Sequence, residues 1–182
     1  MQIPKSLFLM AAGLALSFPS VAQFFSGRIN VAGWGAGVIN VAVEMEMDEH
    51  WSVDLPVYYS PFHKSLYRMG GVMLQPGLKY WLIKPHARSF LCLSATMASF
   101  NIYRSDARHK WGFWSGAGLS YGYSHPLTKR LNLVAEAGLG FYRANIHKRP
   151  YQVDYTEDEY VHRIRRWYLA PSRIELSISY LF

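Results

Sequence analysis

The sequence predicts an all-β protein, an eight-stranded antiparallel up-and-down transmembrane β-barrel, and three observations lead to this fold class. Apolar and polar residues alternate repeatedly along the chain, as they do on strands with two different faces. After the N-terminal segment, no stretch is apolar for the roughly 18 residues that a membrane helix needs. The charged residues of the alternating segments fall on one face, opposite the apolar one.

The composition favours such a barrel without deciding for it. The chain has 182 residues, which suits one domain, and 51% of them are hydrophobic, 16% aromatic and 17% charged. An average protein carries about 25% charged residues. Mean hydropathy is nevertheless near zero, which excludes a bundle of membrane helices. In a membrane barrel only every second strand residue meets lipid, but a soluble β-sandwich or lipocalin-like barrel reaches the same composition.

The net charge of +7 and the pI of about 9.5 make the chain basic. Basic proteins often bind nucleic acid, but here the positive residues are spread among the predicted loops. We therefore expect no nucleic-acid partner, and attraction to outer-membrane lipid and lipopolysaccharide instead. The single cysteine, Cys92, excludes an internal disulfide and thiolate metal clusters, and we expect it to be a small buried thiol.

Residues 1–22 are predicted to be a secretory signal peptide, which leaves 23–182 as the barrel domain. Lys5 supplies the positive start, an apolar run follows, and small residues precede a cut after Ala22. The apolar run is too short to span a bilayer as a helix, which argues against a membrane anchor. No cysteine follows it, so lipoprotein processing is excluded.

The clearest strand is 173–182, where Ile174, Leu176 and Ile178 point one way and Arg173 and Glu175 the other. Seven further segments alternate in the same manner: 28–31, 38–47, 51–60, 72–83, 89–103, 111–123 and 131–141. The segment 89–103 loses its phase near Phe100, where we expect a β-bulge. Eight is the smallest strand number of outer-membrane barrels, and aromatic residues gather near the strand ends, as interfacial girdles require.

The predicted inner face carries ionisable residues, which form a predicted lumen charge network: Glu44, Glu46, Asp54, Lys79, Glu136, Arg173 and Glu175. A soluble barrel would turn its apolar face inward instead. Inward charges in a narrow barrel must pair, because an unpaired buried charge costs several kcal/mol, and Arg28 is a further candidate partner. We expect these polar side chains to fill the interior, which argues against a transport pore.

The connections also alternate in length, a feature that is independent of the apolar–polar alternation of the strands. Short turns are expected at 48–50, 84–88 and 125–129, and longer loops at 61–71, 103–110 and 145–171. A short connection at 35–37 is the exception. This asymmetry is typical of short periplasmic turns and longer external loops.

Three stretches, Trp51–Phe62, Leu74–Leu82 and Ala170–Phe182, resemble a Bacteroidota family of uncharacterised outer-membrane proteins, classed as a domain of unknown function. The resemblance covers about 28–182. It implies an OmpA- or OmpX-like barrel in the cell outer membrane of a Gram-negative bacterium, and it brings no catalytic or cofactor-binding residues. The closing Tyr180 and Phe182 resemble the signal that the outer-membrane assembly machinery reads.

The longest predicted loop, 145–171, contains Arg163, Arg165 and Arg166, a possible surface contact through bidentate bonds to lipopolysaccharide phosphates. We favour the simpler interpretation of a solvated charged loop. The seven histidines are scattered and lack the i, i+4 spacing of zinc proteases, so no metal site is expected.

Some eight-stranded barrels modify lipid A with a serine or histidine beside an acid. Only Ser124-His125 with Glu136 offers such a set, and it falls at the short-turn side, whereas lipid A occupies the outer leaflet. We therefore expect no enzyme and no cofactor, but an outer-membrane protein of structural or surface-interaction type. A lipid A-modifying enzyme and a soluble lipocalin-like binding barrel remain the alternatives.

Overall fold

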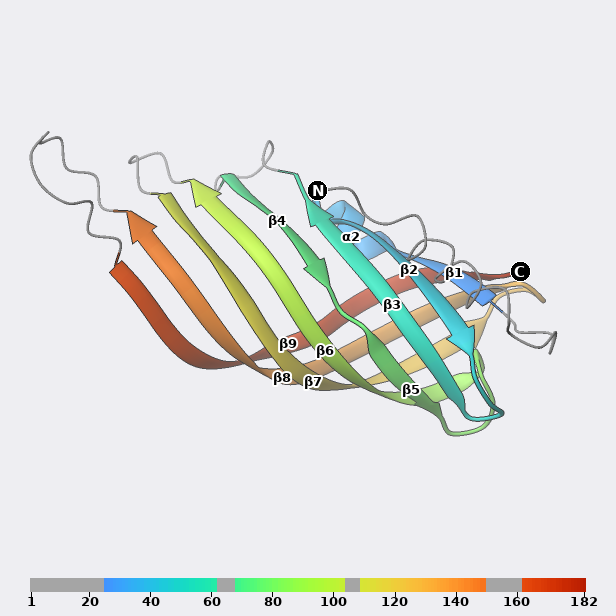
Figure 1. Ribbon diagram of the computed structural model, residues 1–182. Helices are drawn as coiled ribbons and strands as arrows, with labels where there is room; N and C mark the ends of the chain where they lie inside the picture. The colour runs from blue at the N-terminus through green and yellow to red at the C-terminus, as the bar shows by residue number, and fades with distance from the viewer. Residues whose placement is uncertain (1–24, 62–67, 104–108, 150–161) are drawn as a thin grey trace, which may run out of the picture.

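A computed structural model describes residues 25–61, 68–103, 109–149 and 162–182, which form one antiparallel sheet closed into an eight-stranded barrel (Figure 1). The predicted signal peptide, 1–22, lies outside the described residues. The strands are β1 (Phe25–Asn30), β2 (Ile39–Glu46), β3 (Trp51–Ser60), β4 (Arg68–Leu74), β5 (Gly77–Trp81), β6 (Arg88–Tyr103), β7 (His109–Pro126), β8 (Leu131–Arg149) and β9 (His162–Leu181). β4 and β5 share one position in the barrel, because both pair with β3 and with β6. The predicted all-β chain with a closed eight-stranded antiparallel barrel is confirmed, and its placement in a membrane stays a prediction.

The barrel closes where β1 pairs with β2 on one side and with β9 on the other. Ser26, for example, lies opposite Glu44 and Leu181. Residues of each strand pair with residues on the next strand. One full circuit of these pairs, begun at Leu181 of β9, returns to β9 at Ala170, 11 residues earlier on the same strand. This stagger is the tilt that barrel closure requires.

The two ends of the barrel differ. We call the end with the connections 47–50, 82–87 and 127–130 the turn end, and the opposite end, where β3, β6 and β8 finish, the loop end. β6 to β9 contain 16 to 20 residues each, whereas β1 to β5 contain at most 10. The long strands therefore extend beyond β1–β3 at the loop end (Figure 1).

These strand lengths correct the expected long loops. The ladder continues to Arg149 and resumes at His162, so much of the segment 145–171 is strand, not loop. Sequence alternation between apolar and polar residues fades there, because both faces carry polar residues above Phe141. Backbone hydrogen bonds between strands do not depend on that alternation.

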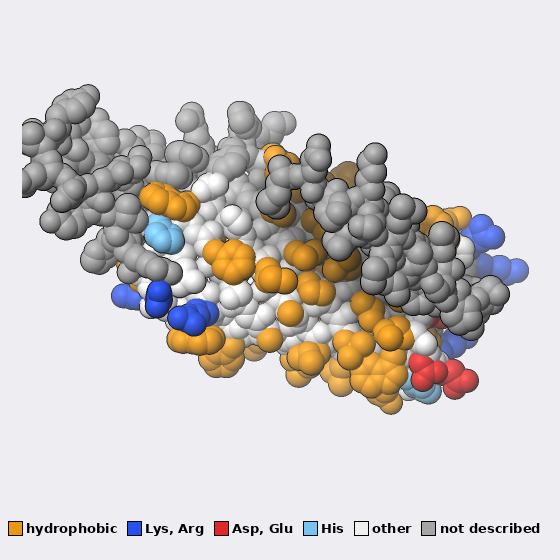
Figure 2. Space-filling model, viewed as in Figure 1, with side chains coloured by type: hydrophobic (Ala, Val, Ile, Leu, Met, Phe, Trp, Pro, Cys, Tyr) orange, Lys and Arg blue, Asp and Glu red, His pale blue; other side chains and the backbone are white. Residues whose placement is uncertain are grey.

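The two faces of the strands have the predicted orientation, with apolar side chains outside. Leu139 is 59% exposed and Leu176 is 46% exposed, whereas Glu136 and Glu175 are only 3% and 5% exposed. Figure 2 shows apolar side chains along the middle of the visible face and charged side chains toward its two ends. The barrel thus places its ionised groups inside.

A short helix, α2 (Val31–Gly35), stands where the sequence predicted the first strand to reach Val31. The side chain of Asn30 accepts a 3.0 Å hydrogen bond from the backbone N–H of Gly33, which caps the helix and ends β1. α2 lies against β9. No helix within the described ranges has the length and apolar character needed to cross a bilayer.

The expected bulge near Phe100 is wrong. β6 and β7 pair without interruption from Arg88 to Tyr103, and the phase is kept. The sequence pattern changes there because the inward residues Ala98 and Phe100 are apolar. The bulge lies in β9 instead, where Ser172 and Arg173 both point inward opposite the step between Ala137 and Leu139 of β8.

Candidate functional site

A cluster of buried ionised groups occupies the part of the barrel interior nearer the turn end, and Asp54 is its centre. Oδ2 of Asp54 accepts hydrogen bonds from Nη2 of Arg28 at 2.8 Å and from Nη1 of Arg173 at 2.6 Å. Nζ of Lys79 lies 3.7 Å from the same oxygen. All four side chains are less than 2% exposed, so these contacts form away from bulk solvent, where charges interact strongly.

Three further carboxylates surround these cations. Glu44 binds Nζ of Lys79 at 2.6 Å, and Glu136 lies 3.2 Å from Nη1 of Arg173. Glu175 lies 3.4 Å from Nη2 of Arg28. The cluster therefore holds the cations Arg28, Lys79 and Arg173 and the carboxylates Glu44, Asp54, Glu136 and Glu175.

Hydroxyl groups compensate for the excess of carboxylates over cations. Ser52 donates a 2.6 Å hydrogen bond to Glu44, and Ser120 donates a 2.5 Å hydrogen bond to Glu136. The hydroxyl of Tyr58 donates to Oε1 of Glu175. Donors of this kind satisfy oxygens of Glu44, Glu136 and Glu175, whereas Oδ1 of Asp54 has no hydrogen-bond partner among the described residues.

The structure brings six of the seven predicted lumen charges together, with Arg28 as the further member. Glu46 lies apart at the turn end, where Oε1 is 3.2 Å from Nε2 of His86. Space for the guanidinium of Arg173 comes from Gly77, since a Cβ there would lie 2.8 Å from Nη2. The apolar–polar alternation of the sequence predicted that these residues share the inner face, but it did not predict which of them form ion pairs.

Aromatic side chains close the interior below the cluster, at the turn end. Trp81 and Phe90 pack with ring centroids 4.6 Å apart, together with Cys92 and Val134. A Cβ on Gly122 would lie 2.2 Å from Cζ of Phe90, so the ring needs a glycine opposite. Nζ of Lys79 sits 4.8 Å from the Phe90 ring centroid, a cation–π contact that links this layer to the cluster.

His86 lies in the connection between β5 and β6 and is 7% exposed. Its carbonyl accepts hydrogen bonds from Ser124 at 3.0 Å and from Asn132 at 3.1 Å, which hold the connection against the barrel. Burial lowers the pKa of His86, because removal from water disfavours the charged imidazolium, although the carboxylate of Glu44 acts in the opposite sense.

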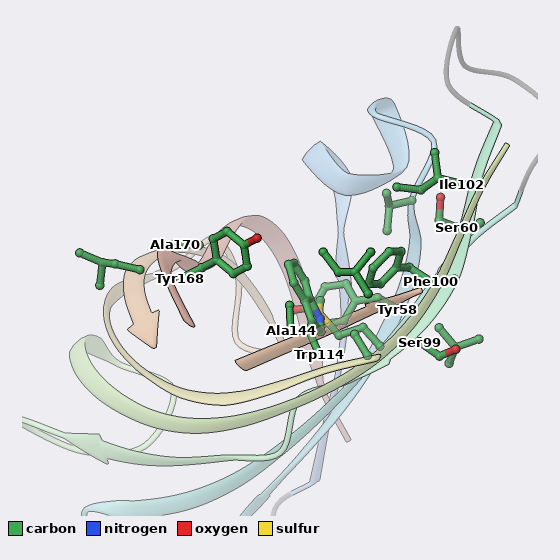
Figure 3. A pocket seen from close by; sticks show the side chains of 17 residues that line it. Tyr58, Ser60, Ser99, Phe100, Ile102, Trp114, Ala144, Tyr168 and Ala170 are labelled. Atoms are coloured by element: carbon green, nitrogen blue, oxygen red, sulfur yellow. The ribbon is translucent and has the colours of Figure 1, made fainter. Parts of the chain in front are cut away.

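A second feature of the interior is an apolar cavity of about 500 Å³ at the loop end (Figure 3). Tyr58 lines it and also binds Glu175, so this tyrosine separates the cavity from the charge cluster. Figure 3 shows Tyr168 on the opposite side of the cavity from Phe100. The lining comes from β3, β4, β6, β7, β8 and β9, and includes Phe100, Ile102, Trp114, Ala144, Ile146 and Ala170. Polar side chains were expected to fill the interior, and that expectation is wrong for this end.

The cavity has rigid aromatic walls. Trp114 stacks on Tyr142 with ring centroids 5.6 Å apart and planes 25° apart, and it meets Phe100 edge-on at 6.5 Å. Glycines leave room for the Tyr142 ring, since a Cβ on Gly116, directly opposite, would lie 2.6 Å from the ring, and a Cβ on Gly140 of the same strand would lie 2.5 Å from its hydroxyl. The described lining residues include no acid, no histidine and no basic side chain, so the cavity is suited to binding an apolar group.

Strand register places the cations Lys110 and Arg166 on the inward face, opposite residues that line the cavity. Lys110 lies directly opposite Ile102, and Arg166 lies directly opposite Ala144. Directly paired residues of antiparallel strands share one face of the sheet. Ile102 and Ala144 both line the cavity, so Lys110 and Arg166 stand on the cavity side at the loop end.

The predicted surface arginines lie on β9 rather than in a loop. Arg165 and Arg166 are exposed, and they point to opposite faces because they are neighbours on one strand. Arg165 shares the outward face with Asn145. The side chain of Arg163 lies outside the described part of the structure.

The residues weighed for catalysis do not come together. Ser124 is buried and bonds to the carbonyl of His86, whereas His125, the next residue on β7, is exposed on the opposite face. Glu136 is bound by Ser120 and Arg173. Within the described residues, no three His, Cys, Asp or Glu side chains form a group that could hold a metal ion.

The fold and its interior define a class, the closed eight-stranded β-barrels with a charged lumen. Within that class the chain belongs to a family described as "Protein of unknown function (DUF3575)", whose model matches residues 7–182. No curated protein and no solved structure matches the chain.

Proposed function

We propose that this protein is an outer-membrane β-barrel of structural or surface-interaction type, without catalysis. The observation that carries the proposal is the distribution of charge. Along the outward faces of the described strands, no charged side chain lies between the turn end and Arg143, while the interior holds paired ions. Water would favour the reverse arrangement, and lipid favours this one.

The length of the apolar surface supports the proposal. On β8 every outward side chain from Leu131 to Phe141 is apolar, and Arg143 follows. A tilted strand crosses a bilayer in about 9–11 residues. Aromatic rings gather at the turn end of this surface, where Trp51 and Tyr80 meet edge-to-face at 5.0 Å. Such rings are typical of a membrane interface.

Outside the lipid we propose that the loop end faces the cell exterior and contacts lipopolysaccharide. Arg143 and Arg165 are exposed on the outward face just beyond the apolar surface. Guanidinium groups bind phosphate in a bidentate geometry, and lipid A carries phosphates at this depth. Contact with lipopolysaccharide requires this orientation of the barrel, in which the turn end faces the periplasm.

Export and assembly complete the proposal. Residues 1–22 would direct export in a Gram-negative bacterium, and the OmpA- or OmpX-like kinship and Bacteroidota origin belong to the same hypothesis. Tyr180 and Phe182 meet edge-to-face at 5.4 Å on the outer surface, where they are 39% and 74% exposed. We propose that the outer-membrane assembly machinery reads this pair.

The experiment is fractionation of cells expressing the full chain, followed by gel mobility with and without boiling. We expect the protein in the outer-membrane fraction, with a band that migrates differently after boiling, because a closed barrel resists detergent when cold. A soluble periplasmic protein would contradict the proposal and would favour a lipocalin-like barrel. Conversion of lipid A by the purified protein would contradict the absence of catalysis.

A further inference from the structure

The apolar cavity at the loop end lies above a layer that closes it. Tyr58 forms part of this layer through its bond to Glu175, and Gln75 adds hydrogen bonds of 2.8 Å to Thr96 and 2.9 Å to the carbonyl of Ser172. Below that layer the charge cluster occupies the axis. Within the described residues the cavity is therefore closed on the cluster side, because a molecule could pass there only by breaking ion pairs, and it is approached from the loop-end side.

The size and lining of the cavity define the part of a ligand that it accepts. A volume of about 500 Å³ lies within the range of roughly 300–1,000 Å³ found for small-molecule sites. Its walls are aromatic rings and aliphatic side chains, so they offer dispersion contacts and few hydrogen bonds. An alkyl chain suits these walls.

Lys110 and Arg166 define the other part of the ligand. Both stand on the cavity side of their strands, directly opposite Ile102 and Ala144. Cations beside an apolar cavity favour a molecule with an anionic head and an apolar tail. A double-chain phospholipid would have to place its second chain outside this one cavity.

We propose that the cavity binds a long-chain carboxylate, a fatty acid, with its alkyl chain between Phe100, Trp114 and Tyr168 and its carboxylate at Lys110 and Arg166. This inference rests on the proposed function in one respect, because the membrane setting would supply such a lipid. The inference adds a class of ligand, fatty acids, to the barrel proposed above.

The experiment uses the full chain in dimyristoylphosphatidylcholine nanodiscs and a palmitate that carries a photoreactive diazirine on its chain. We expect saturable crosslinking to inward residues of β6, β7 and β9, competed by unlabelled palmitate. A144W should weaken binding about tenfold or more, because each methylene kept out of an apolar site costs binding free energy. The control A137W, on the outward face of the same strand, should bind normally.

R166E should also weaken palmitate binding, while K129E, an exposed charge change at the turn end, should not. R166E alters an exposed side chain, so it tests the proposal even where A144W does not fold. Normal binding to both A144W and R166E would overturn it. So would crosslinking of the cavity by a diazirine phosphatidylcholine in place of palmitate.

The fractionation experiment separates this inference from the proposed function. An outer-membrane protein that does not bind palmitate would overturn only the inference. A soluble periplasmic protein that binds it at the same residues would support the inference and overturn the membrane placement.

Discussion

Arg173 on β9 donates a 2.6 Å hydrogen bond to Asp54 on β3, across the barrel interior and 119 residues away in the sequence. The β-bulge at Ser172 and Arg173 turns both side chains inward, and Gly77 leaves space for the guanidinium. Arg28 reaches the same carboxylate oxygen from β1. One carboxylate thus connects the first and last strands of the barrel with β3.

Replacing Asp54 with asparagine should therefore destabilise the barrel more than replacing any other carboxylate of the cluster. D54N leaves Arg28 and Arg173 close together without the charge that both contact, and breaking such a buried pair costs about 3–5 kcal/mol. The measurement is the urea midpoint of unfolding in micelles, read from gel mobility.

The matched comparison is E175Q. Among the described residues, Glu175 contacts one cation, Arg28 at 3.4 Å, and two hydroxyls, with Tyr58 donating to Oε1 and Ser177 to Oε2. The single oxygen of a glutamine amide can accept one of these hydrogen bonds, and the other hydroxyl can accept one from the amide N–H. We expect E175Q to lower stability by less than D54N. Equal losses in the two variants would show that Asp54 is not the centre of the cluster.

Gly122 should tolerate no side chain while Phe90 is opposite. G122A places a Cβ 2.2 Å from the Phe90 ring, and overpacking of this kind costs about 1–3 kcal/mol. The double variant with F90L should recover part of the lost stability in the same unfolding assay. G27A is the control, because a Cβ there would lie at an ordinary 3.4 Å from Phe182. Loss in G27A as large as in G122A would contradict this account.

The sequence alone predicted the strands and their two faces well. Period-2 alternation decides which way Leu176 and Glu175 point, because successive strand residues take opposite faces whatever their partners are. The same argument placed Glu136 and Lys79 inside. The ion pairs themselves needed the register between strands that are far apart in the chain, which alternation does not contain.

The cavity was missed for a physical reason. At the loop end both faces of β6 carry apolar or weakly polar residues, so the apolar–polar alternation is lost near Phe100. The strand itself continues there, and Phe100 points inward to line the cavity. Helix α2 was missed because its start depends on a cap from Asn30, a residue that also suits a strand end. The full lengths of the long strands β6 to β9 were missed because their backbone pairing continues past the apolar surface.

The folded barrel should lose stability as the pH falls below about 6.5, partly through His86. Burial lowers its pKa below that ordinary value, so the unfolded chain binds a proton more readily than the folded one in this range. H86Q should reduce the slope of unfolding free energy against pH between about 5 and 7. H125Q, at an exposed position, is the control, and an unchanged slope in H86Q would contradict the assignment.

Arg143 and Arg165 should set the affinity for lipopolysaccharide. The double variant R143E/R165E should weaken binding of purified lipopolysaccharide to the barrel in micelles, with a larger effect at low salt, because exposed charge interactions are screened. Charge reversal at Lys129 and Arg130, at the turn end, should have little effect. A result in which the turn-end variant loses binding instead would reverse the proposed orientation.

The central claim is that the exposed apolar face of the barrel lies in lipid, and cysteine accessibility on β8 tests it most directly. Leu139 and Arg143 share the outward face of one strand, and both are exposed to the surroundings of the protein. In a C92S background, which removes the buried thiol, L139C and R143C would be treated in intact cells with a membrane-impermeant maleimide. The account predicts that R143C is labelled and L139C is protected until detergent is added. Labelling of L139C as fast as R143C would contradict it.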